Sequence, residues 1–387
     1  MSEWKKVKLG EISQTIQTGP FGSQLHQSDY SVIGIPVVMP KDIIAGNIEE
    51  ASIARVEQHH IDRLSRHMIS YGDILYARRG DVGKCAFTKQ NQEGWLCGTG
   101  CLRVTINPDM ANPKFVFFQL QKQETIGWIT NHAIGSTMLN LNTTILSNAP
   151  VEIPSLRIQN RIVEILSRYD SLIENYQKQI KLLEEAAQRL YKEWFVDFHF
   201  PGHETTKIVY GVPEGWTPSQ LGQLAEFKRG KTITKKDVID GNIPVVAGGL
   251  EPAYYCNKSN TAERVITISG SGANAGFTRM YFEKVWASDC SFVDASVTPF
   301  LHFVYCFLKN NKTTIDNLQK GAAQPHVYAK DINSLSICIP IESVLKSFEE
   351  KVSNYFDTTA SLQSQLRLLT EARDRLLPKL TNGEMEI

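Results

Sequence analysis

An internal repeat constrains this chain more than any other feature of its sequence. The C-terminal parts of the two halves align without a gap at a separation of 186 residues, which places Gly135 on Gly321 and Tyr169 on Tyr355. In the best-preserved stretch, residues 179–190 against 365–376, seven of twelve positions are identical. The N-terminal parts match more loosely, although IPVV occurs at 35–38 and again at 243–246. Two long copies indicate a duplication rather than a solenoid of many short repeats.

The end of each half has the apolar spacing of a long helix. Between Ile158 and Trp194 apolar residues recur every three or four positions, and the second tail has a similar stripe. Such a stripe needs a partner, so we predict that the two helices pair as an antiparallel coiled coil. The residues expected in this pairing are Ile158, Ile162, Tyr169, Ile180, Leu183 and Leu190 in the first helix, and Leu366, Leu369 and Leu376 in the second.

Prolines punctuate both predicted helices. Pro154 and Pro340 precede them, while Pro201-Gly202 and Pro378 are expected to end them. About 37 residues at ~1.5 Å per residue make each helix roughly 55 Å long.

The regions before the helices combine short β-rich runs with helical segments. Examples are GDILYA at 72–77 and RVITIS at 264–269, and each region ends in an aromatic helical run, at 114–121 or 301–308, that is expected to face the core. We therefore predict an α+β fold with two mixed α/β domains, each followed by a long helix, related by pseudo-two-fold symmetry. The predicted divisions are residues 1–155, 156–200, 201–341 and 342–387.

Composition excludes several classes of protein. Lys plus Arg and Asp plus Glu both number 41, and 42% of residues are hydrophobic, which is ordinary globular composition. No apolar run reaches the ~20 residues of a membrane span, and the N-terminus has no signal-peptide pattern. Seven cysteines without a CxxC pair favour free thiols and a cytoplasmic location.

Motifs for catalysis or metal binding are missing. AEFKRGKT at 225–232 has Ala225 where a phosphate-binding loop needs glycine, and His59-His60 has no third ligand at a suitable spacing. No Ser-His-Asp order or acid–base pair stands out. We therefore expect no catalytic residue, no metal and no cofactor in this chain.

Four loops have the composition of recognition surfaces. Residues 18–30 and 77–84, the latter with a looser counterpart at 269–279, combine glycines with polar and basic residues. Residues 227–237 carry five basic residues and one acidic, and residues 321–331 form a further polar loop. Arginine and lysine can reach phosphates or guanine edges, and asparagine can pair with adenine. The candidate DNA-binding residues are Gly19, Phe21, Gly22, Ser23, Gln24, Arg78, Arg79, Lys84, Lys228, Arg229, Lys231, Asn274, Arg279, Gln324 and His326.

Together with the repeat, several segments resemble the specificity subunit of type I restriction–modification systems. GDILYARRGDVGK at 72–84 is similar to the family's glycine-rich recognition motif, and the segment from Gly135-Ser136-Thr137 to Pro154 resembles its closing segment. Residues 194–204 and 212–237 resemble the junction into its second domain. The resemblance covers essentially the whole chain. One departure is that a Glu-Gln pair often starts the family's helix, whereas only Gln159 is present here.

The resemblance implies two target-recognition domains, each reading one half of an asymmetric, split site in double-stranded DNA. It implies that the paired helices set the spacing and dock two methyltransferase subunits, and that two motor–nuclease subunits complete the complex. S-adenosylmethionine, ATP and Mg would then belong to those partners. A rod of ~55 Å would span about one and a half turns of duplex at ~34–36 Å per turn.

Two other classes remain as alternatives. A coiled-coil scaffold with two protein-binding domains and no DNA would fit the zero net charge, since nucleic-acid binders usually have a basic surplus. A self-contained nuclease or methyltransferase would need a motif that we do not find. The chain could also be a spare recognition subunit that exchanges into a working locus.

Overall fold

The computed structural model describes residues 4–135, 139–321 and 324–385, and it divides into two compact units. The first unit comprises the chain up to residue 173 together with the segment from residue 368 onward, and the second comprises residues 174–367. The division passes through both long helices, so it does not coincide with the divisions drawn from the sequence. Each unit is described by itself. No helix of the described chain is long and apolar enough to cross a membrane.

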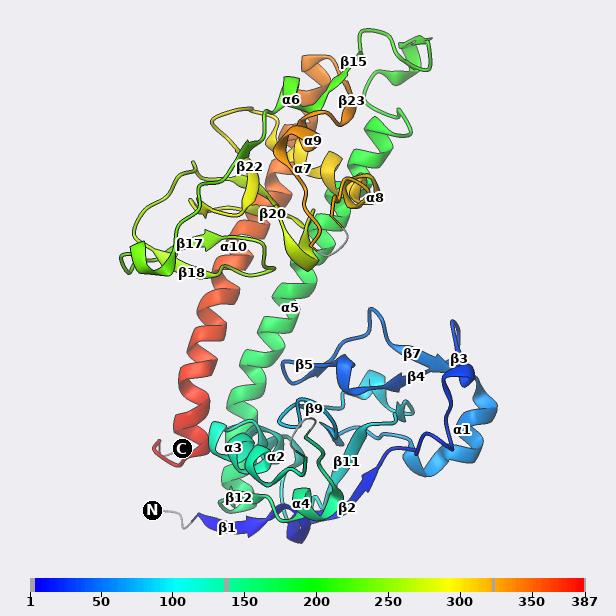
Figure 1. The fold of residues 1–387 in the computed structure, drawn as a ribbon, viewed down its shortest axis with the longest axis vertical. Helices are drawn as coiled ribbons and strands as arrows, with labels where there is room; N and C mark the ends of the chain where they lie inside the picture. The colour runs from blue at the N-terminus through cyan, green and yellow to red at the C-terminus, as the bar shows by residue number, and fades with distance from the viewer. Residues whose placement is uncertain (1–3, 136–138, 322–323, 386–387) are drawn as a thin grey trace. The chain divides into compact units, whose positions relative to one another are not determined.

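The first unit is built on two four-stranded sheets (Figure 1). One has the order β2-β11-β8-β9 and is antiparallel throughout; the other has the order β10-β4-β7-β3, with β10 parallel to β4. Their bounds are β2 (Ser13–Thr18), β11 (Cys101–Ile106), β8 (Ile74–Ala77), β9 (Cys85–Phe87), β10 (Leu96–Cys97), β4 (Ile35–Val38), β7 (Ala54–Val56) and β3 (Tyr30–Ser31). The other elements are β1 (Lys5–Lys8), β12 (Pro150–Ile153), β5 (Ile43–Ile44), β6 (Asn47–Ile48), α1 (Gln58–Leu64), α2 (Pro113–Leu120), α3 (Gln123–His132) and α4 (Thr143–Ser147).

The second unit repeats this topology in a reduced form. Its larger sheet has the order β16-β22-β19-β20, and its smaller sheet has β17 between the antiparallel β18 and the parallel β21. The bounds are β16 (Lys228–Arg229), β22 (Cys290–Asp294), β19 (Val265–Ser269), β20 (Thr278–Tyr281), β18 (Tyr254–Cys256), β17 (Ile243–Val246) and β21 (Trp286–Ala287). The other elements are β13 (Ile208–Val209), β14 (Val212–Pro213), β15 (Thr217–Gln220), β23 (Ser336–Ile339), α6 (Leu221–Leu224), α7 (Leu301–Asn310), α8 (Lys312–Asp316) and α9 (Ala329–Asn333).

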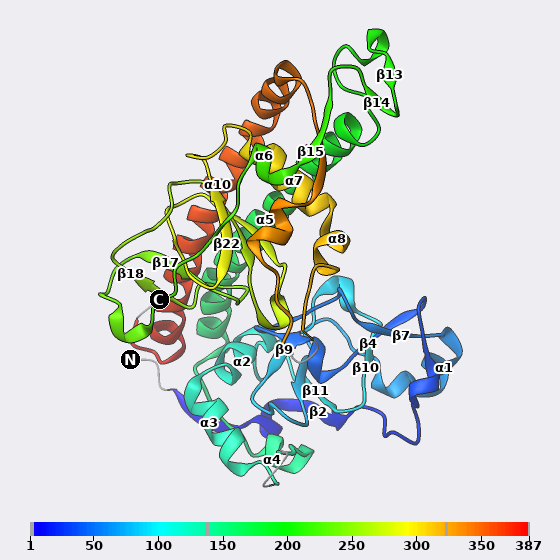
Figure 2. The ribbon, with the colours of Figure 1, turned by 45° about the horizontal axis from the view of Figure 1, so that its top comes forward.

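Two helices of 40 residues each, α5 (Leu156–Phe195) and α10 (Glu342–Thr381), complete the cores of these units. In the first unit Ile162 and Leu166 of α5 share a buried cluster with Leu380 of α10. In the second unit the ring of Tyr191, near the end of α5, lies 6.3 Å from that of Phe348, near the start of α10. Both helices can be followed in Figure 2. Because the start of one helix meets the end of the other in both units, the pairing is antiparallel, as the repeat predicted.

The residues expected along the helix pair differ in burial. Ile162 is buried, and Ile158, Leu190 and Leu376 pack partly buried against the unit cores. Tyr169, Ile180, Leu183, Leu366 and Leu369 are only half-buried. Much of the pairing is made instead by the aromatic residues Tyr191, Trp194, Phe195 and Phe348.

Both predicted helix ends were wrong in detail. Helix α5 ends at Phe195, before Pro201, and Phe198 adopts a left-handed conformation with φ of 60°. Helix α10 continues through Pro378 to Thr381. Proline is tolerated there because it lies in the last turn, where it costs one hydrogen bond. Tertiary contact also holds this turn, since Gln119 donates a buried hydrogen bond of 2.7 Å to the carbonyl of Thr381.

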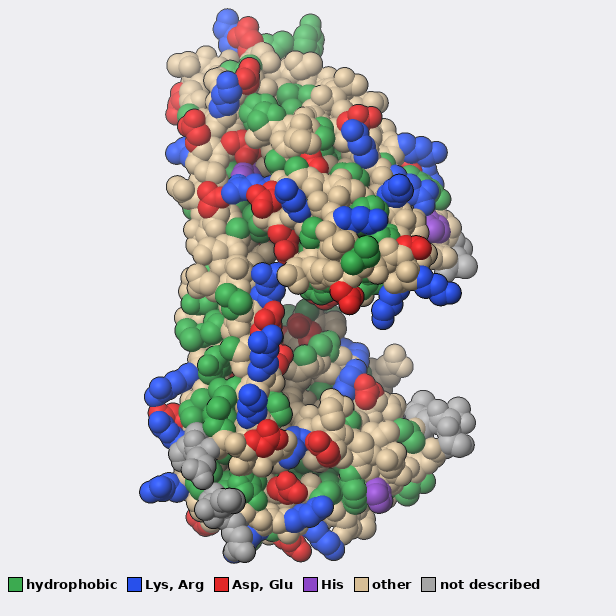
Figure 3. Space-filling model, turned by 90° about the vertical axis from the view of Figure 1, so that its left-hand side faces the viewer, with side chains coloured by type: hydrophobic (Ala, Val, Ile, Leu, Met, Phe, Trp, Pro, Cys, Tyr) green, Lys and Arg blue, Asp and Glu red, His purple; other side chains and the backbone are tan. Residues whose placement is uncertain are grey.

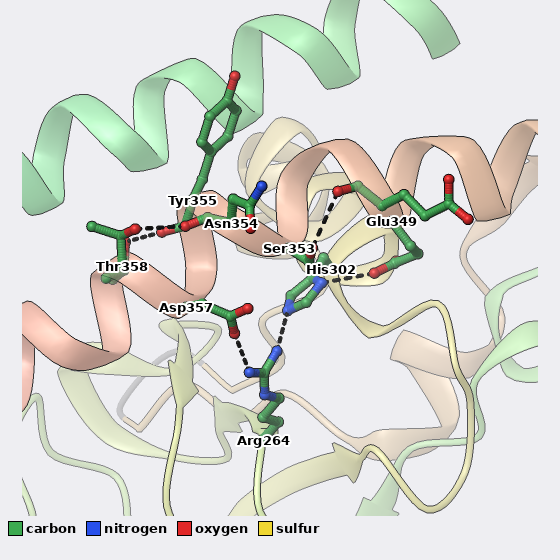
Figure 4. Close-up of polar contacts among 10 residues, drawn as sticks. Arg264, His302, Glu349, Ser353, Asn354, Tyr355, Asp357 and Thr358 are labelled. Atoms are coloured by element: carbon green, nitrogen blue, oxygen red, sulfur yellow. Dashed lines mark hydrogen bonds and ion pairs between the residues drawn. The ribbon is translucent and has the colours of Figure 1, made fainter.

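In the second unit α7 is anchored to α10 by a polar network (Figure 4). One carboxylate oxygen of Glu349 accepts from the backbone N–H of Phe303 at 2.9 Å, and the other lies 2.7 Å from Nδ1 of His302. Glu349 thereby satisfies an N–H that the first turn of α7 leaves without an intrahelical partner. Arg264 lies 3.3 Å from Nε2 of His302 and forms an ion pair with Asp357.

The burial of the two acidic residues predicts different effects of their removal. The Glu349 side chain is 15% exposed, whereas that of Asp357 is 51% exposed. Glu349→Ala leaves a donor at the start of α7 unpaired, so we expect a loss of about 1–3 kcal/mol in the free energy of unfolding. Asp357→Ala removes an exposed ion pair and should cost less than about 1 kcal/mol. Urea denaturation measures both, and equal losses would contradict the anchoring role of Glu349.

Candidate nucleic-acid interface

In the first unit four separate loops are tied together by backbone hydrogen bonds. The N–H of Gly19, after β2, donates to the carbonyl of Cys101 at 2.9 Å. The N–H of Arg78, after β8, donates to Gly100 at 2.7 Å, and its carbonyl accepts from Leu141 at 2.8 Å. We call residues 19–24, 78–84, 98–100 and 139–141 the first loop cluster.

The second unit repeats the same connections. Gly230 donates to the carbonyl of Cys290 at 2.8 Å, Gly270 donates to Asp289 at 3.1 Å, and Val327 donates to Gly270 at 3.1 Å. We call residues 229–231, 270–274, 287–289 and 324–327 the second loop cluster. Each loop of one cluster thus has a counterpart in the other, and Gly270 occupies the place of Arg78. The sequence match of residues 74–87 to 266–278 predicted this equivalence.

Glycine is required where the first loop of each cluster crosses the neighbouring loop. A Cβ atom on Gly19 would lie 2.1 Å from the carbonyl oxygen of Gly98, and one on Gly230 would lie 2.3 Å from that of Ser288. Neither backbone can retreat without breaking the hydrogen bonds that hold the cluster. A Cβ atom on Gly22, by contrast, would have no neighbouring atom within 4 Å. The role of Gly19 is therefore to allow close packing.

The basic candidates fall into two groups. No hydrogen bond or ion pair within the described residues engages the guanidinium and ammonium groups of Arg78, Arg79, Lys228, Arg229 and Lys231.

Lys84 and Arg279, in contrast, are partly neutralised. Lys84 lies 3.2 Å from Asp81, and Arg279 lies 3.3 Å from Glu251 while also donating to the carbonyl of Leu250 at 2.8 Å. These two residues are less available to a polyanion. In the first unit the unpaired cations are Arg78 and Arg79, in the loop after β8. In the second unit they lie on β16 and in the loop that follows it.

The polar candidates also differ in their surroundings. Gln24 accepts from the backbone of Phe21 and so closes its own loop, while Phe21 is 53% exposed and Ser23 is exposed. Asn274 lies 3.4 Å from the carbonyl of Gly248. In the second cluster Gln324 is exposed and His326 stacks on Tyr328, with ring centroids 6.0 Å apart. Ser136 and Thr137 of the predicted closing segment lie outside the described residues.

Several residues of the clusters were not predicted from the sequence. Thr99 and Asn140 contribute to the first cluster, and in the second the hydroxyl of Ser271 donates to the carboxylate of Asp289. Asn140 pairs with Arg79 through an isolated bridge, and His326 pairs with Ser271 in the same way. Aligning 139–141 with 325–327 at the separation of 186 residues would have found Asn140 as the counterpart of His326.

The clusters carry no arrangement typical of an enzyme centre. Across the described ranges, no three His, Cys, Asp or Glu side chains gather as metal ligands. All seven cysteines are free thiols, and burial raises the pKa of Cys85 and Cys97 to about 12. Basic and acidic side chains are interspersed over the face drawn in Figure 3. The clusters present cations, amides and an exposed aromatic ring, which are groups that bind ligands through charge, hydrogen bonds and stacking.

Comparisons with known proteins agree on one family. A family model for the "Type I restriction modification DNA specificity domain" matches residues 1–185 and 213–369. The MjaIX specificity subunit of Methanocaldococcus jannaschii is 26% identical over all of this chain and 94% of its own length. The HindI specificity subunit of Haemophilus influenzae is 22% identical over the full length of both chains. A crystal structure of an S subunit from M. genitalium matches with a TM-score of 0.63 at 18% identity, covering 98% of this chain and 96% of that one.

The two glycines of the first loop provide a matched test of the close crossing. Gly19→Ala forces a methyl group against the backbone of Gly98, and we expect it to lower the free energy of unfolding by about 1–3 kcal/mol. Gly22→Ala meets no neighbour and should change it by less than about 0.5 kcal/mol. Thermal or urea unfolding distinguishes the two variants, and equal stabilities would contradict the crossing.

Proposed function

This chain belongs to the type I restriction–modification DNA specificity family, and we propose that it is the subunit through which such a complex selects its DNA sequence. Each loop cluster would read one half of an asymmetric, bipartite site in double-stranded DNA. The observation that carries this proposal is the repetition of one backbone frame with different side chains at equivalent positions. Arg78 in one cluster corresponds to Gly270 in the other, and Asn140 corresponds to His326. Equivalent frames with unlike side chains are what two unlike half-sites require.

The chemistry of the exposed groups supports a duplex as the ligand. Five unpaired cations at or beside the clusters can contact phosphates, while Asn274 and Gln324 offer the amide groups that read base edges. Phosphate contacts fix the position of a protein on DNA, and contacts to base edges supply specificity. Because the net charge of the chain is zero, partner subunits would supply much of the remaining phosphate contact.

The long helices would serve the complex in two ways. Since each helix contributes to the core of both units, the pair would fix the spacing of the two half-sites. Exposed apolar residues on the helices, such as Leu172, Leu182 and Leu368, would contribute to docking two modification subunits. Methyl transfer and, where two restriction subunits are present, cleavage would take place on those partners. They would bind S-adenosylmethionine, ATP and Mg, and this chain would bind no cofactor of its own.

The decisive test is the adenine methylation pattern of a host without other adenine methyltransferases. The chain is co-expressed with its modification subunit and compared with the modification subunit alone, and methylated adenines are mapped by single-molecule sequencing. We expect a new split motif with two unlike halves and a fixed gap. A stable complex that adds no methylation and binds duplex DNA without sequence preference would contradict the proposal. It would favour the scaffold or a spare recognition subunit.

Two arginines of the second unit provide a matched test of phosphate contact. Arg229 is unpaired within the described residues, whereas Arg279 is held by Glu251 and Leu250. Arg229→Gln should reduce the slope of log affinity against log salt by about 0.9, because one fewer counterion is released. Arg279→Gln should leave the slope nearly unchanged. Fluorescence anisotropy with labelled duplex DNA measures both slopes for the complex with the modification subunit, over a range of salt concentrations. If both variants give the same slope as the unchanged chain, Arg229 is not in the interface.

A further inference from the structure

Buried polar atoms without partners are concentrated in the first loop cluster. Six such side-chain atoms occur among the described residues, and three of them belong to this cluster: Nε of Arg78, Oγ1 of Thr99 and Oδ1 of Asn140. None belongs to the second cluster within the part of the chain that the structure describes. A buried donor or acceptor without a partner is unfavourable, and its partner must come from water or from a ligand. The first cluster therefore has hydrogen-bonding groups that its own fold does not satisfy.

Arg78 is the best-positioned of these residues to contact a ligand. Its backbone is held on both sides, by Gly100 and by Leu141, so the start of its side chain is fixed. Its guanidinium carbon lies 6.0 Å from the centroid of the Phe21 ring, which restricts the side chain further through a cation–π contact. The guanidinium has no hydrogen bond or ion pair among the described residues. The Arg78 guanidinium can therefore donate two parallel hydrogen bonds to a ligand that carries two neighbouring acceptors.

The second cluster cannot make the same contact. Gly270 stands at the place of Arg78 and has no side chain. Its neighbour Ser271 is already paired with the carboxylate of Asp289, which accepts hydrogen bonds and repels acceptor groups. The unpaired basic candidates of the second unit, Lys228, Arg229 and Lys231, lie on β16 and the loop after it instead. The two clusters thus differ in hydrogen-bonding character at one equivalent position.

We infer that Arg78 is a specificity-determining residue and that it reads a guanine in the half-site bound by the first unit. Guanine is the base that presents two acceptors, N7 and O6, side by side in the major groove, and arginine supplies donors without any acceptor. The unpaired atoms of Thr99 and Asn140 are further groups that the same ligand would satisfy. Arg79, exposed and beside it, contacts the phosphate backbone. This inference rests on the proposed function and adds the identity of one base.

The first experiment compares methylation motifs of the unchanged chain and of Arg78 variants in the complex with its modification subunit. Arg78→Gln should relax or change one guanine position in one half of the motif and leave the other half intact. Arg78→Lys should do the same, because an ammonium group keeps the charge but lacks the bidentate fork. Arg79→Ala is the control and should lower methylation evenly without altering the motif.

A second experiment tests the contact without changing the protein. Each guanine of that half-site is replaced in turn by 7-deazaguanine, which lacks the N7 acceptor, and binding of the complex is measured by fluorescence anisotropy. One position should weaken binding by about tenfold, and the same replacement should have no effect on the Arg78→Gln complex. Because the search for a sensitive guanine uses the unchanged chain, that part of the experiment stands even if the Arg78→Gln variant folds poorly.

The outcomes separate the inference from the proposed function. If the unchanged chain gives no split motif, the proposed function fails. If it gives a split motif but Arg78→Gln retains it fully, Arg78 reads no base and the inference is wrong. If no 7-deazaguanine position weakens binding, the inference is likewise wrong while the proposed function stands.

Discussion

Both units depend on the packing of each α/β region against both long helices. The first unit completes its core with Leu380, from the end of the chain, and the second completes its core with Tyr191 and Trp194, from the helix that follows the first α/β region. Neither copy of the repeat therefore contains the whole core of one unit. After the duplication, each unit takes helical residues from both copies of the repeat. Disturbing the helix pair would disturb both units, which explains why the helical tails are better preserved between the two halves than the regions before them.

On this scaffold the backbone is constant and the side chains vary. Equivalent hydrogen bonds hold four loops in each cluster, and the same close crossing requires glycine at 19 and at 230. Such a frame fixes where side chains leave the backbone without fixing which side chains they are. On the proposed function, changing a residue at position 78 or 270 would alter what is recognised at little cost to the fold. That separation of frame and side chain is what a protein needs if its specificity is to change while its assembly is kept.

Much of the fold could be predicted from the sequence because the repeat and the helical periodicity are strong signals. The α+β class, the two long helices and the strands around IPVV and RVITIS are present as expected. Helix ends were less predictable, because Gln119 holds the turn after Pro378 through a contact 262 residues away in sequence. Leu183 and similar residues in the middle of the helices are only half-buried. Aromatic side chains near the helix ends, such as Phe195 and Phe348, make close ring contacts.

The candidate interface was only partly predictable for a similar reason. Composition identified the loops, but it could not separate Arg78, whose guanidinium has no hydrogen bond or ion pair within the described residues, from Lys84, which is paired with Asp81. It also missed Asn140 and Asp289, which become part of the clusters only through backbone pairing between distant segments. Residue type suggests what a side chain can bind, while tertiary contacts decide whether it is still free to bind it.

The central claim is that the two clusters read two half-sites independently on one shared scaffold. The most direct measurement is the affinity of the complex for duplexes in which one half-site at a time is scrambled, for the unchanged chain and for a chain altered in one cluster only. We predict that a change in the first cluster no longer alters the affinity when the half-site bound by that cluster is scrambled. The same change should lower the affinity by its full amount when the other half-site is scrambled. An effect that is the same on all duplexes would contradict the account.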